Sequence, residues 1–194
     1  MARAQTRTSA AKNDGGAGRT LAIASIAVVA GGLVGNLLRK SAVQGPSVLA
    51  GQWDQALAAE HKAVLALIDK TMQTSDKRTA LRATLLMQIK HALGKHSFAE
   101  ENTVYAKMRD LGMPEGADHL NHEHGYIKQH LFDLTEMRKD DPNWVPTMRK
   151  LRDLVAEHAG EEENDVFPKL KGKLDEAGNK HLTLAMNKEA FKLA

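Results

Sequence analysis

The sequence predicts an all-α protein: an up-down-up-down four-helix bundle with an extra C-terminal helix and an N-terminal hydrophobic helix. The first observation is composition, because only 4% of the 194 residues are aromatic and only five are proline, while good helix formers are plentiful. The second is that the predicted helices are joined by short connections, which makes neighbours antiparallel. The third is an internal repeat in which one helical hairpin is used twice.

The first 40 residues divide into two parts. Residues 1–20 are small, polar and basic, which is typical of a disordered tail. Residues 21–40 are predicted to form a hydrophobic helix, since 21–38 contain no charge and a helix of that length just spans a bilayer core. The favoured interpretation is a single-pass membrane anchor. A signal peptide and a peripheral or disordered hydrophobic segment are the alternatives.

Two further expectations concern this hydrophobic helix. Gly31 and Gly35 form a GxxxG pair, which allows two such helices to pack closely and predicts a homodimer through this segment. More lysine and arginine residues precede the apolar run than follow it closely. The N-terminus is therefore expected in the cytoplasm, and the bundle in the periplasm rather than the cytoplasm.

The remainder is predicted as a linker over 41–50, a four-helix bundle over 51–172 and a C-terminal helix over 173–194. Capping residues, prolines and glycines set the expected helix boundaries. In chain order, helices are expected over about 52–72, from a cap at Ser75 or Asp76 to 111, from Pro114 to 139, from Asp141-Pro142 to 171, and over about 174–192.

The charge distribution argues against nucleic acid as a partner. The formal net charge is +3, but residues 1–40 carry six basic residues and one acidic residue. Residues 41–194 then hold 21 basic and 23 acidic residues, without the clustered lysine and arginine that phosphate backbones require. The chain has no cysteine, which excludes disulfides, thiolate metal sites and thiol catalysis.

Two segments repeat the same pattern without a gap: HSFAEENTVYAKM from His96, and HAGEEENDVFPKL from His158. In both, a glutamate follows the histidine by four residues, at Glu100 and Glu162. Residues four apart lie on one face of a helix, so each histidine and its glutamate are expected to point the same way.

A fainter repeat links the first and third predicted helices. His61 and His124 each follow a glutamate and precede an apolar stripe. Each hairpin therefore carries one histidine on its first helix and a His-x-x-x-Glu pair on its second. Duplication is expected to place both sets around a pseudo-twofold axis in the middle of the bundle.

These converging side chains predict a metal centre. A buried ionised carboxylate is costly unless it is paired or bound to a metal. Imidazole and carboxylate without thiolate suit iron, manganese or zinc. The expected arrangement is one metal at each histidine pair, with the glutamates between them. The predicted ligands are His61 and His96 for one metal, His124 and His158 for the other, and Glu100 and Glu162 between the two.

Several neighbouring residues are weaker candidates. Glu101 and Glu163 directly follow the predicted ligands, and a rotation of about 100° favours solvent exposure or a supporting contact over ligation. Tyr105 and Phe167, at matching positions of the repeat, are expected to pack in the core. Solvent exposure or a supporting contact is also expected for Glu60, Glu123, His119 and His122.

Together these residues resemble the hemerythrin family, in its bacterial HHE cation-binding branch, over about residues 52–171. The resemblance implies a four-helix bundle with a non-haem di-iron centre bridged by two carboxylates and an oxo or hydroxo group. It also implies reversible binding of dioxygen, or a role with nitric oxide, iron sensing or oxidative stress. The residues that carry it are Glu60-His61, His96 with Glu100-Glu101, Glu123-His124, and His158 with Glu162-Glu163 before Phe167-Pro168.

One departure from the family affects the second metal. Oxygen-carrying hemerythrins have two histidines four residues apart on the third helix, but Leu120 and Lys128 stand four before and four after His124. A vacant coordination position is also what ligand binding or redox turnover requires. The candidates to replace the missing histidine are water, Glu123, His119 and His122.

Three functions follow from these observations. The favoured one is a di-iron protein, a binding protein more than an enzyme, that binds dioxygen or nitric oxide or handles iron in oxidative or nitrosative stress. A redox enzyme that reduces peroxide or nitric oxide, or oxidises ferrous iron, would use the same centre, but spacing identifies no general acid for it. The third is a metal-free, membrane-tethered structural or adaptor bundle, which predicts equal stability with and without metal.

Overall fold

The computed structural model describes residues 51–193, and helices account for nearly all of them, with no strand in this part. The predicted tail, hydrophobic helix and linker lie outside the described residues. The elements are α2 (Trp53–Met72), α3 (Thr79–Asn102), α4 (Val104–Asp110), α5 (Pro114–Glu136), α6 (Trp144–Glu161), a π-helical turn η1 (Glu162–Val166), α7 (Phe167–Lys173) and α8 (Glu176–Leu193).

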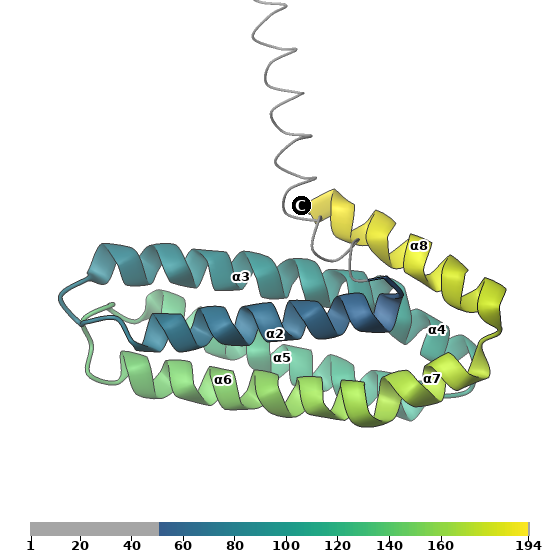
Figure 1. Cartoon of the computed structure of the whole chain (residues 1–194). Helices are drawn as coiled ribbons and strands as arrows, with labels where there is room; N and C mark the ends of the chain where they lie inside the picture. The colour runs from purple at the N-terminus through teal and green to yellow at the C-terminus, as the bar shows by residue number, and fades with distance from the viewer. Residues whose placement is uncertain (1–50, 194) are drawn as a thin grey trace, which may run out of the picture. The chain divides into compact units, whose positions relative to one another are not determined.

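The four long helices α2, α3, α5 and α6 lie side by side, and short loops connect them as antiparallel neighbours (Figure 1). α2 packs against α3 and α6, and α5 packs closely against α6 and less closely against α3. α4 and α7 continue α3 and α6 at the same end of the bundle (Figure 1). The predicted all-α bundle with an added C-terminal helix is therefore confirmed.

Several boundaries differ from the prediction for local reasons. α3 begins at Thr79, because Ser75 belongs to a separate turn in which its hydroxyl accepts a backbone N–H. α6 begins at Trp144, because the Asp141 carboxylate accepts the N–H two residues on and holds a turn there. α4 ends just before Gly112, whose φ of 74° only glycine adopts readily, in agreement with the predicted stop.

The hydrophobic core consists of two clusters with a polar layer between them. On α2, for example, His61 lies between Leu57 of one cluster and Val64 of the other. The cluster nearer α8 includes Trp53, Leu57, Met108, Leu120, Phe167, Leu170 and Leu182. The cluster at the other end includes Val64, Ile68, Ile89, Leu93, Leu131, Trp144 and Met148. The helices are therefore held together on both sides of the layer that contains the predicted ligands.

The C-terminal helix α8 caps the start of α2. The Trp53 indole N–H donates to Asn179 Oδ1 at 3.0 Å, and the Trp53 backbone N–H donates to the Thr183 hydroxyl at 3.1 Å. Asn179 also donates through Nδ2 to backbone carbonyls around the α7–α8 connection. The first turn of a helix has unsatisfied N–H groups, so Thr183 supplies a partner that α2 otherwise lacks.

We expect Asn179→Ala to lower the free energy of unfolding by about 2 kcal/mol, because it removes a buried acceptor and leaves the Trp53 N–H unpaired. Chemical denaturation of the metal-free protein measures this loss. Asn187→Ala on the same helix is the matched control, since Asn187 Oδ1 is buried without a hydrogen-bond partner among the described residues. Equal losses in both variants would contradict the role given to Asn179.

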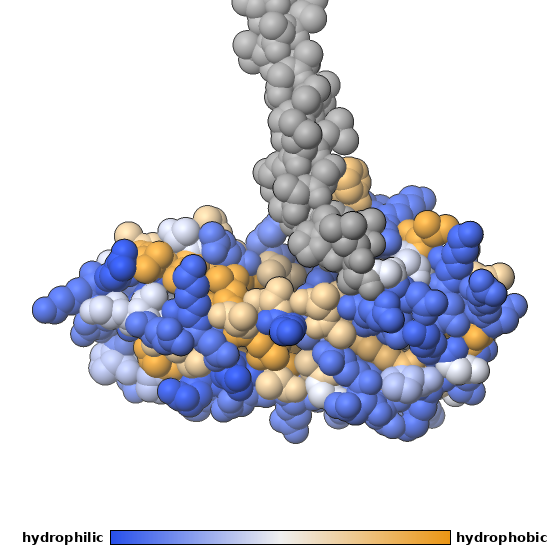
Figure 2. Space-filling view, in the orientation of Figure 1, coloured by the Kyte–Doolittle hydropathy of each residue, from blue (hydrophilic) through white to orange (hydrophobic). Residues whose placement is uncertain are grey.

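The face of the bundle shown in Figure 2 is mostly hydrophilic, with apolar residues gathered between its hydrophilic ends. On α2 the exposed residues include Ala59, Ala63 and Ala66. Among residues 51–193, no helix has both the length and the apolarity to cross a membrane. The predicted anchor at 21–38 lies outside this range.

Candidate metal centre

The six predicted ligands meet in the polar layer at the middle of the bundle. All are buried, with at most 5% of any of these residues exposed. Because the histidine and glutamate of each repeat lie four residues apart, they share one inward face of their helix. Their positions are His61 on α2, His96 and Glu100 on α3, His124 on α5, His158 on α6, and Glu162 at the start of η1.

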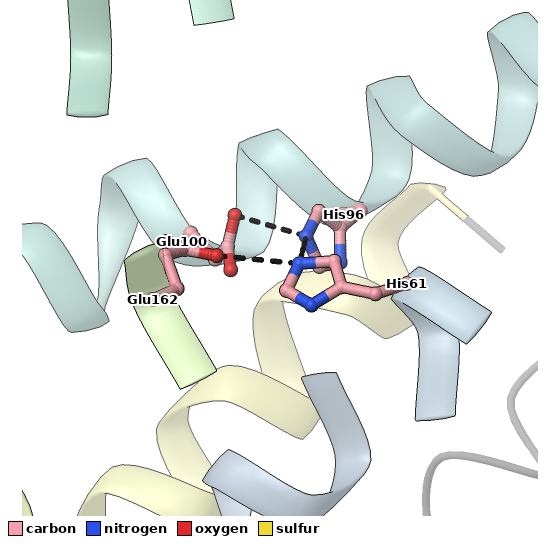
Figure 3. Close-up of side chains that lie close together, drawn as sticks. All are labelled: His61, His96, Glu100 and Glu162. Atoms are coloured by element: carbon pink, nitrogen blue, oxygen red, sulfur yellow. Dashed lines mark hydrogen bonds and ion pairs between the residues drawn. The ribbon is translucent and has the colours of Figure 1, made fainter. Parts of the chain in front are cut away.

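One half of the centre is formed by His61, His96, Glu100 and Glu162 (Figure 3). The Nε2 atoms of His61 and His96 are 2.9 Å apart. Glu162 Oε2 lies 3.2 Å from His61 Nε2, and Glu100 Oε2 lies 3.2 Å from His96 Nε2. These ligand atoms all lie within 4.8 Å of one another, which is close enough for one cation to contact several of them.

The other half repeats this geometry. The Nε2 atoms of His124 and His158 are 3.1 Å apart. Glu100 Oε2 lies 3.4 Å from His124 Nε2, and Glu162 Oε2 lies 3.4 Å from His158 Nε2. Each glutamate therefore contacts one histidine of each pair and stands between the two halves. The similar distances are the three-dimensional counterpart of the sequence repeat.

Each of the four histidines has its outer nitrogen, Nδ1, at hydrogen-bond distance from a different glutamate. The pairs are His61 with Glu163 at 2.8 Å, His96 with Glu60 at 3.0 Å, His124 with Glu101 at 3.0 Å, and His158 with Glu123 at 2.7 Å. The glutamates directly before His61 and His124 and the glutamates directly after Glu100 and Glu162 therefore have the same role. A carboxylate behind a histidine fixes its orientation and makes it a stronger metal ligand.

This outer ring sets the chemistry of the interior. A neutral imidazole that donates through Nδ1 has only a lone pair at Nε2. All four Nε2 lone pairs then point at one another and at the two buried carboxylates. Among the described residues, both oxygens of Glu100 and Oε2 of Glu162 have no hydrogen-bond donor. Such a collection of facing acceptors is unfavourable unless cations lie among them, so the residues fit a bound metal.

The electrostatics of the metal-free layer point the same way. Burial, and then the nearby Glu162 carboxylate, raise the pKa of Glu100 well above its usual range. Burial opposes a charge on His61, but the adjacent Glu162 carboxylate, 3.2 Å away, and the Glu100 carboxylate raise the pKa of His61 to about 9. In the metal-free protein, protons held on Glu100 and His61 therefore partly balance the buried negative charge. Metal binding must displace these protons.

Both helices that carry a His-x-x-x-Glu pair are irregular just after the glutamate. Glu162 begins the π-helical turn η1, and Thr103, three residues after Glu100, separates α3 from α4. Pro168 lacks an N–H and cannot continue the regular bonding at the first site, which accounts for the π turn. At the second, the Thr103 hydroxyl donates to the Ala99 carbonyl and stabilises the break. The sequence pattern predicted continuous helices at both places.

Tyr105 is a contributor to the centre that the sequence placed only in the core. It is fully buried, and its hydroxyl donates to Glu162 Oε1 at 2.8 Å and lies 3.3 Å from His124 Nε2. Phe167 stands at the matching position of the repeat and stacks on His61 instead. The His124–His158 half therefore has a nearby hydroxyl group, able to donate a hydrogen bond, that the other half lacks. The Tyr/Phe difference between the repeats was the signal for it.

The two histidine candidates for the missing ligand, His119 and His122 on α5, lie outside the centre. His119 is 54% exposed and contacts Glu161 and Glu123 at the surface. His122 is also exposed and contacts the Tyr126 hydroxyl. Neither reaches the buried layer, because each is rotated away from His124 on the helix. Leu120 is buried in the core, and the Lys128 ammonium pairs with Glu101.

Comparison with known proteins identifies the family that this chain matches. A family model, the hemerythrin HHE cation-binding domain, matches residues 54–170 and so includes all six predicted ligands. A hemerythrin-like protein of Schizosaccharomyces pombe is 28% identical over 130 residues, 66% of this chain and 63% of the relative. The chain thus spans less than two thirds of that relative, whose fungal origin says nothing about a bacterial branch. No solved structure matches the chain significantly. The chain belongs to the hemerythrin family, as its repeated His and Glu residues predicted.

Proposed function

We propose that the chain is a non-haem di-iron protein that binds dioxygen or nitric oxide at the buried layer. The observation that carries the proposal is the complete set of inward-facing acceptors, each histidine supported from behind by its own glutamate. A purely structural role does not explain these four histidines and six glutamates at matching positions, because apolar residues of similar volume stabilise a core at least as well.

The residues divide between two ions. His61 and His96 would hold one ion and His124 and His158 the other, and both ions would share Glu100 and Glu162, because each glutamate lies beside one histidine of both pairs. Imidazole and carboxylate ligands without thiolate favour iron, with manganese and zinc as the competing metals. Bound iron supplies reversible redox chemistry and a coordination position for the diatomic ligand. The chain's own residues supply the position, the charge balance and the exclusion of bulk water.

The deciding experiment measures metals per chain in the full-length protein after loading. Spectra are then recorded for the anaerobically reduced protein, after air, and after nitric oxide. Two irons per chain with an oxo-bridge absorption band, and a stable adduct with either gas, are expected. Two zinc or manganese ions in place of iron, or no bridge band, would overturn the di-iron assignment while leaving the metal site in place.

A redox enzyme that reduces peroxide or nitric oxide is the second candidate, and Tyr105 is the observation in its favour. Its hydroxyl lies within the centre and can donate a proton to a neighbouring group. Sequence spacing alone did not identify this general acid. Repeated consumption of peroxide by the loaded chain would favour this function. A gas adduct that persists without turnover would favour binding.

We expect Tyr105→Phe to preserve the fold but to weaken one of the two metal-binding steps by about 10–100-fold. The reason is that Phe167 is accepted at the matching position, so only the hydroxyl bonded to Glu162 is lost. Competition with a chelator, followed over both binding steps, measures the effect. Tyr126→Phe removes an exposed hydroxyl as the control. Unchanged affinity at both steps would remove Tyr105 from the site.

We also propose that residues 21–38 anchor the bundle to a membrane, with Gly31 and Gly35 as the contact of a homodimer. The support is the uncharged stretch and its flanking basic residues. A reporter fused after Ala194 tests the side of the membrane on which the bundle lies. A soluble fraction that contains the intact chain would contradict the anchor.

A further inference from the structure

A cavity of about 210 Å³ lies between α3 and α5, and all four histidines of the centre line it. We propose that this cavity is the entry route and binding pocket for a small uncharged ligand, and that Gly94 at its mouth sets the size limit. The inference rests on the proposed function for the identity of the ligand. The remaining lining residues are Lys90, Leu93, Gly94, Ser97, Ile127, Lys128, Leu131 and Val155.

The cavity runs from solvent to the centre. Lys90, Gly94 and Lys128 are exposed, whereas Leu93 and the histidines are buried, so the mouth lies at the first three residues. A Cβ atom at Gly94 would meet no other atom within 4 Å. Glycine is a poor helix former, and here it leaves the mouth of the cavity free of a side chain.

The repeat shows that this opening is specific to one side of the bundle. Ala156 stands at the position that matches Gly94, and Arg152, which matches Lys90, forms an ion pair with Asp69. α2 packs more closely on α6 than α3 does on α5. The depression lined by α2 residues and by Glu163 of η1 reaches only His61 of the four histidines. The pseudo-symmetry is therefore broken in favour of an entry between α3 and α5.

A second groove, between α2 and α3, does not offer an equivalent path. It reaches His96 alone among the four histidines. There it meets the ion pair of Lys95 and Glu60, and Glu60 also binds His96 Nδ1. A ligand that entered here would have to separate a partly buried charge pair, which is costly.

The walls of the cavity indicate what it admits. Leu93, Ile127, Leu131 and Val155 contribute aliphatic side chains to the lining, and the hydroxyl of Ser97 is already bonded to the Leu93 carbonyl. The two lysines at the mouth are engaged, Lys128 with Glu101 and Lys90 with the Thr135 hydroxyl. Dehydrating an ion against such walls is unfavourable, whereas a diatomic gas loses little. The volume of the cavity, about 210 Å³, is also below the range of about 300–1,000 Å³ for pockets that hold drug-sized molecules.

The first test uses xenon as an uncharged probe and zinc-loaded full-length protein, so that it does not depend on iron. Xenon NMR of the wild type should show saturable binding, and Gly94→Leu should abolish it. Gly125→Leu is the matched control, because Gly125 is also an exposed helical glycine with no atom near its Cβ, but lies outside the cavity. Undiminished xenon binding by Gly94→Leu, or loss in both variants, would overturn the pocket.

The second test follows nitric oxide association by stopped flow with the iron-loaded chain. Gly94→Leu should slow association at least 10-fold with unchanged iron per chain, Gly94→Ala should slow it less, and Gly125→Leu should match the wild type. Equal rates in all variants would overturn the entry route. Failure to load iron would defeat the proposed function alone, since the xenon result stands independently of it.

Discussion

Glu162→Ala is expected to reduce the metal content of the full-length chain from two ions to one or none. Glu162 is fully buried, and its Oε2 lies 3.2 Å from His61 Nε2 and 3.4 Å from His158 Nε2. Its removal therefore takes an oxygen ligand from both halves of the centre at once. Elemental analysis after loading and desalting measures the outcome, with circular dichroism to show that the helices persist.

The run of three glutamates provides matched controls within one turn of helix. Glu163 supports His61 through Nδ1, so Glu163→Ala should leave two ions bound but weaken their affinity by about 10–100-fold. Glu161 lies partly exposed beside His119, so Glu161→Ala should change neither quantity. The loss of metal binding should therefore be largest for Glu162→Ala, smaller for Glu163→Ala and absent for Glu161→Ala. The same loss in all three variants would show that general acidity, and not position, determines metal binding.

The sequence predicted the bundle and the six inward residues because both follow from periodicity. A spacing of four fixes the face shared by His96 and Glu100, and the repeat supplies the same face a second time at His158 and Glu162. Short loops and clear helix stops then determine the antiparallel order. These signals are local, so they can be recognised in the sequence without knowledge of tertiary contacts.

The outer ring of glutamates depends on contacts between helices. The sequence therefore left two alternatives open for these residues, solvent exposure or a supporting contact. Glu101 supports His124 on α5, and Glu123 supports His158 on α6. Whether such a side chain meets a neighbour or faces solvent depends on how far one helix is shifted along the next. Moving such a glutamate by one position in the sequence would also displace its carboxylate by about 1.5 Å along the helix axis and by about 100° around it.

The direction of the Tyr105 hydroxyl is a similar case. An aromatic residue on a buried face is typical core packing, and the ring of Tyr105 does belong to the core cluster near α8. Its hydroxyl reaches Glu162 because α4 begins a new helix after Thr103, which sets the orientation of the residues that follow. A helix break that is stabilised by such a side-chain-to-backbone hydrogen bond is not visible in hydrophobic periodicity.

Removing the metals is expected to lower the thermal midpoint of unfolding by on the order of 10–20 °C. A ligand present at 1,000 times its dissociation constant stabilises the folded state by about 4 kcal/mol, provided that it does not bind the unfolded chain. Here the gain comes from satisfying the buried Glu100 and Glu162 oxygens that have no donor among the described residues. Calorimetry of the full-length chain before and after chelation measures the difference, and a metal-free adaptor bundle would show none.

Glu100→Gln separates this linkage from general damage to the fold. The amide has nearly the same size as the carboxylate but carries no charge, and no hydrogen bond to Glu100 is lost. The metal-free variant should therefore unfold within about 1 kcal/mol of the metal-free wild type, because burial raises the pKa of Glu100 and already disfavours its charged form there. The variant should also gain little from added metal, because a ligand of both halves has become neutral. If Glu100→Gln destabilised the metal-free form strongly and kept the full metal-dependent gain, Glu100 would be a structural residue and the ligand assignment would fail.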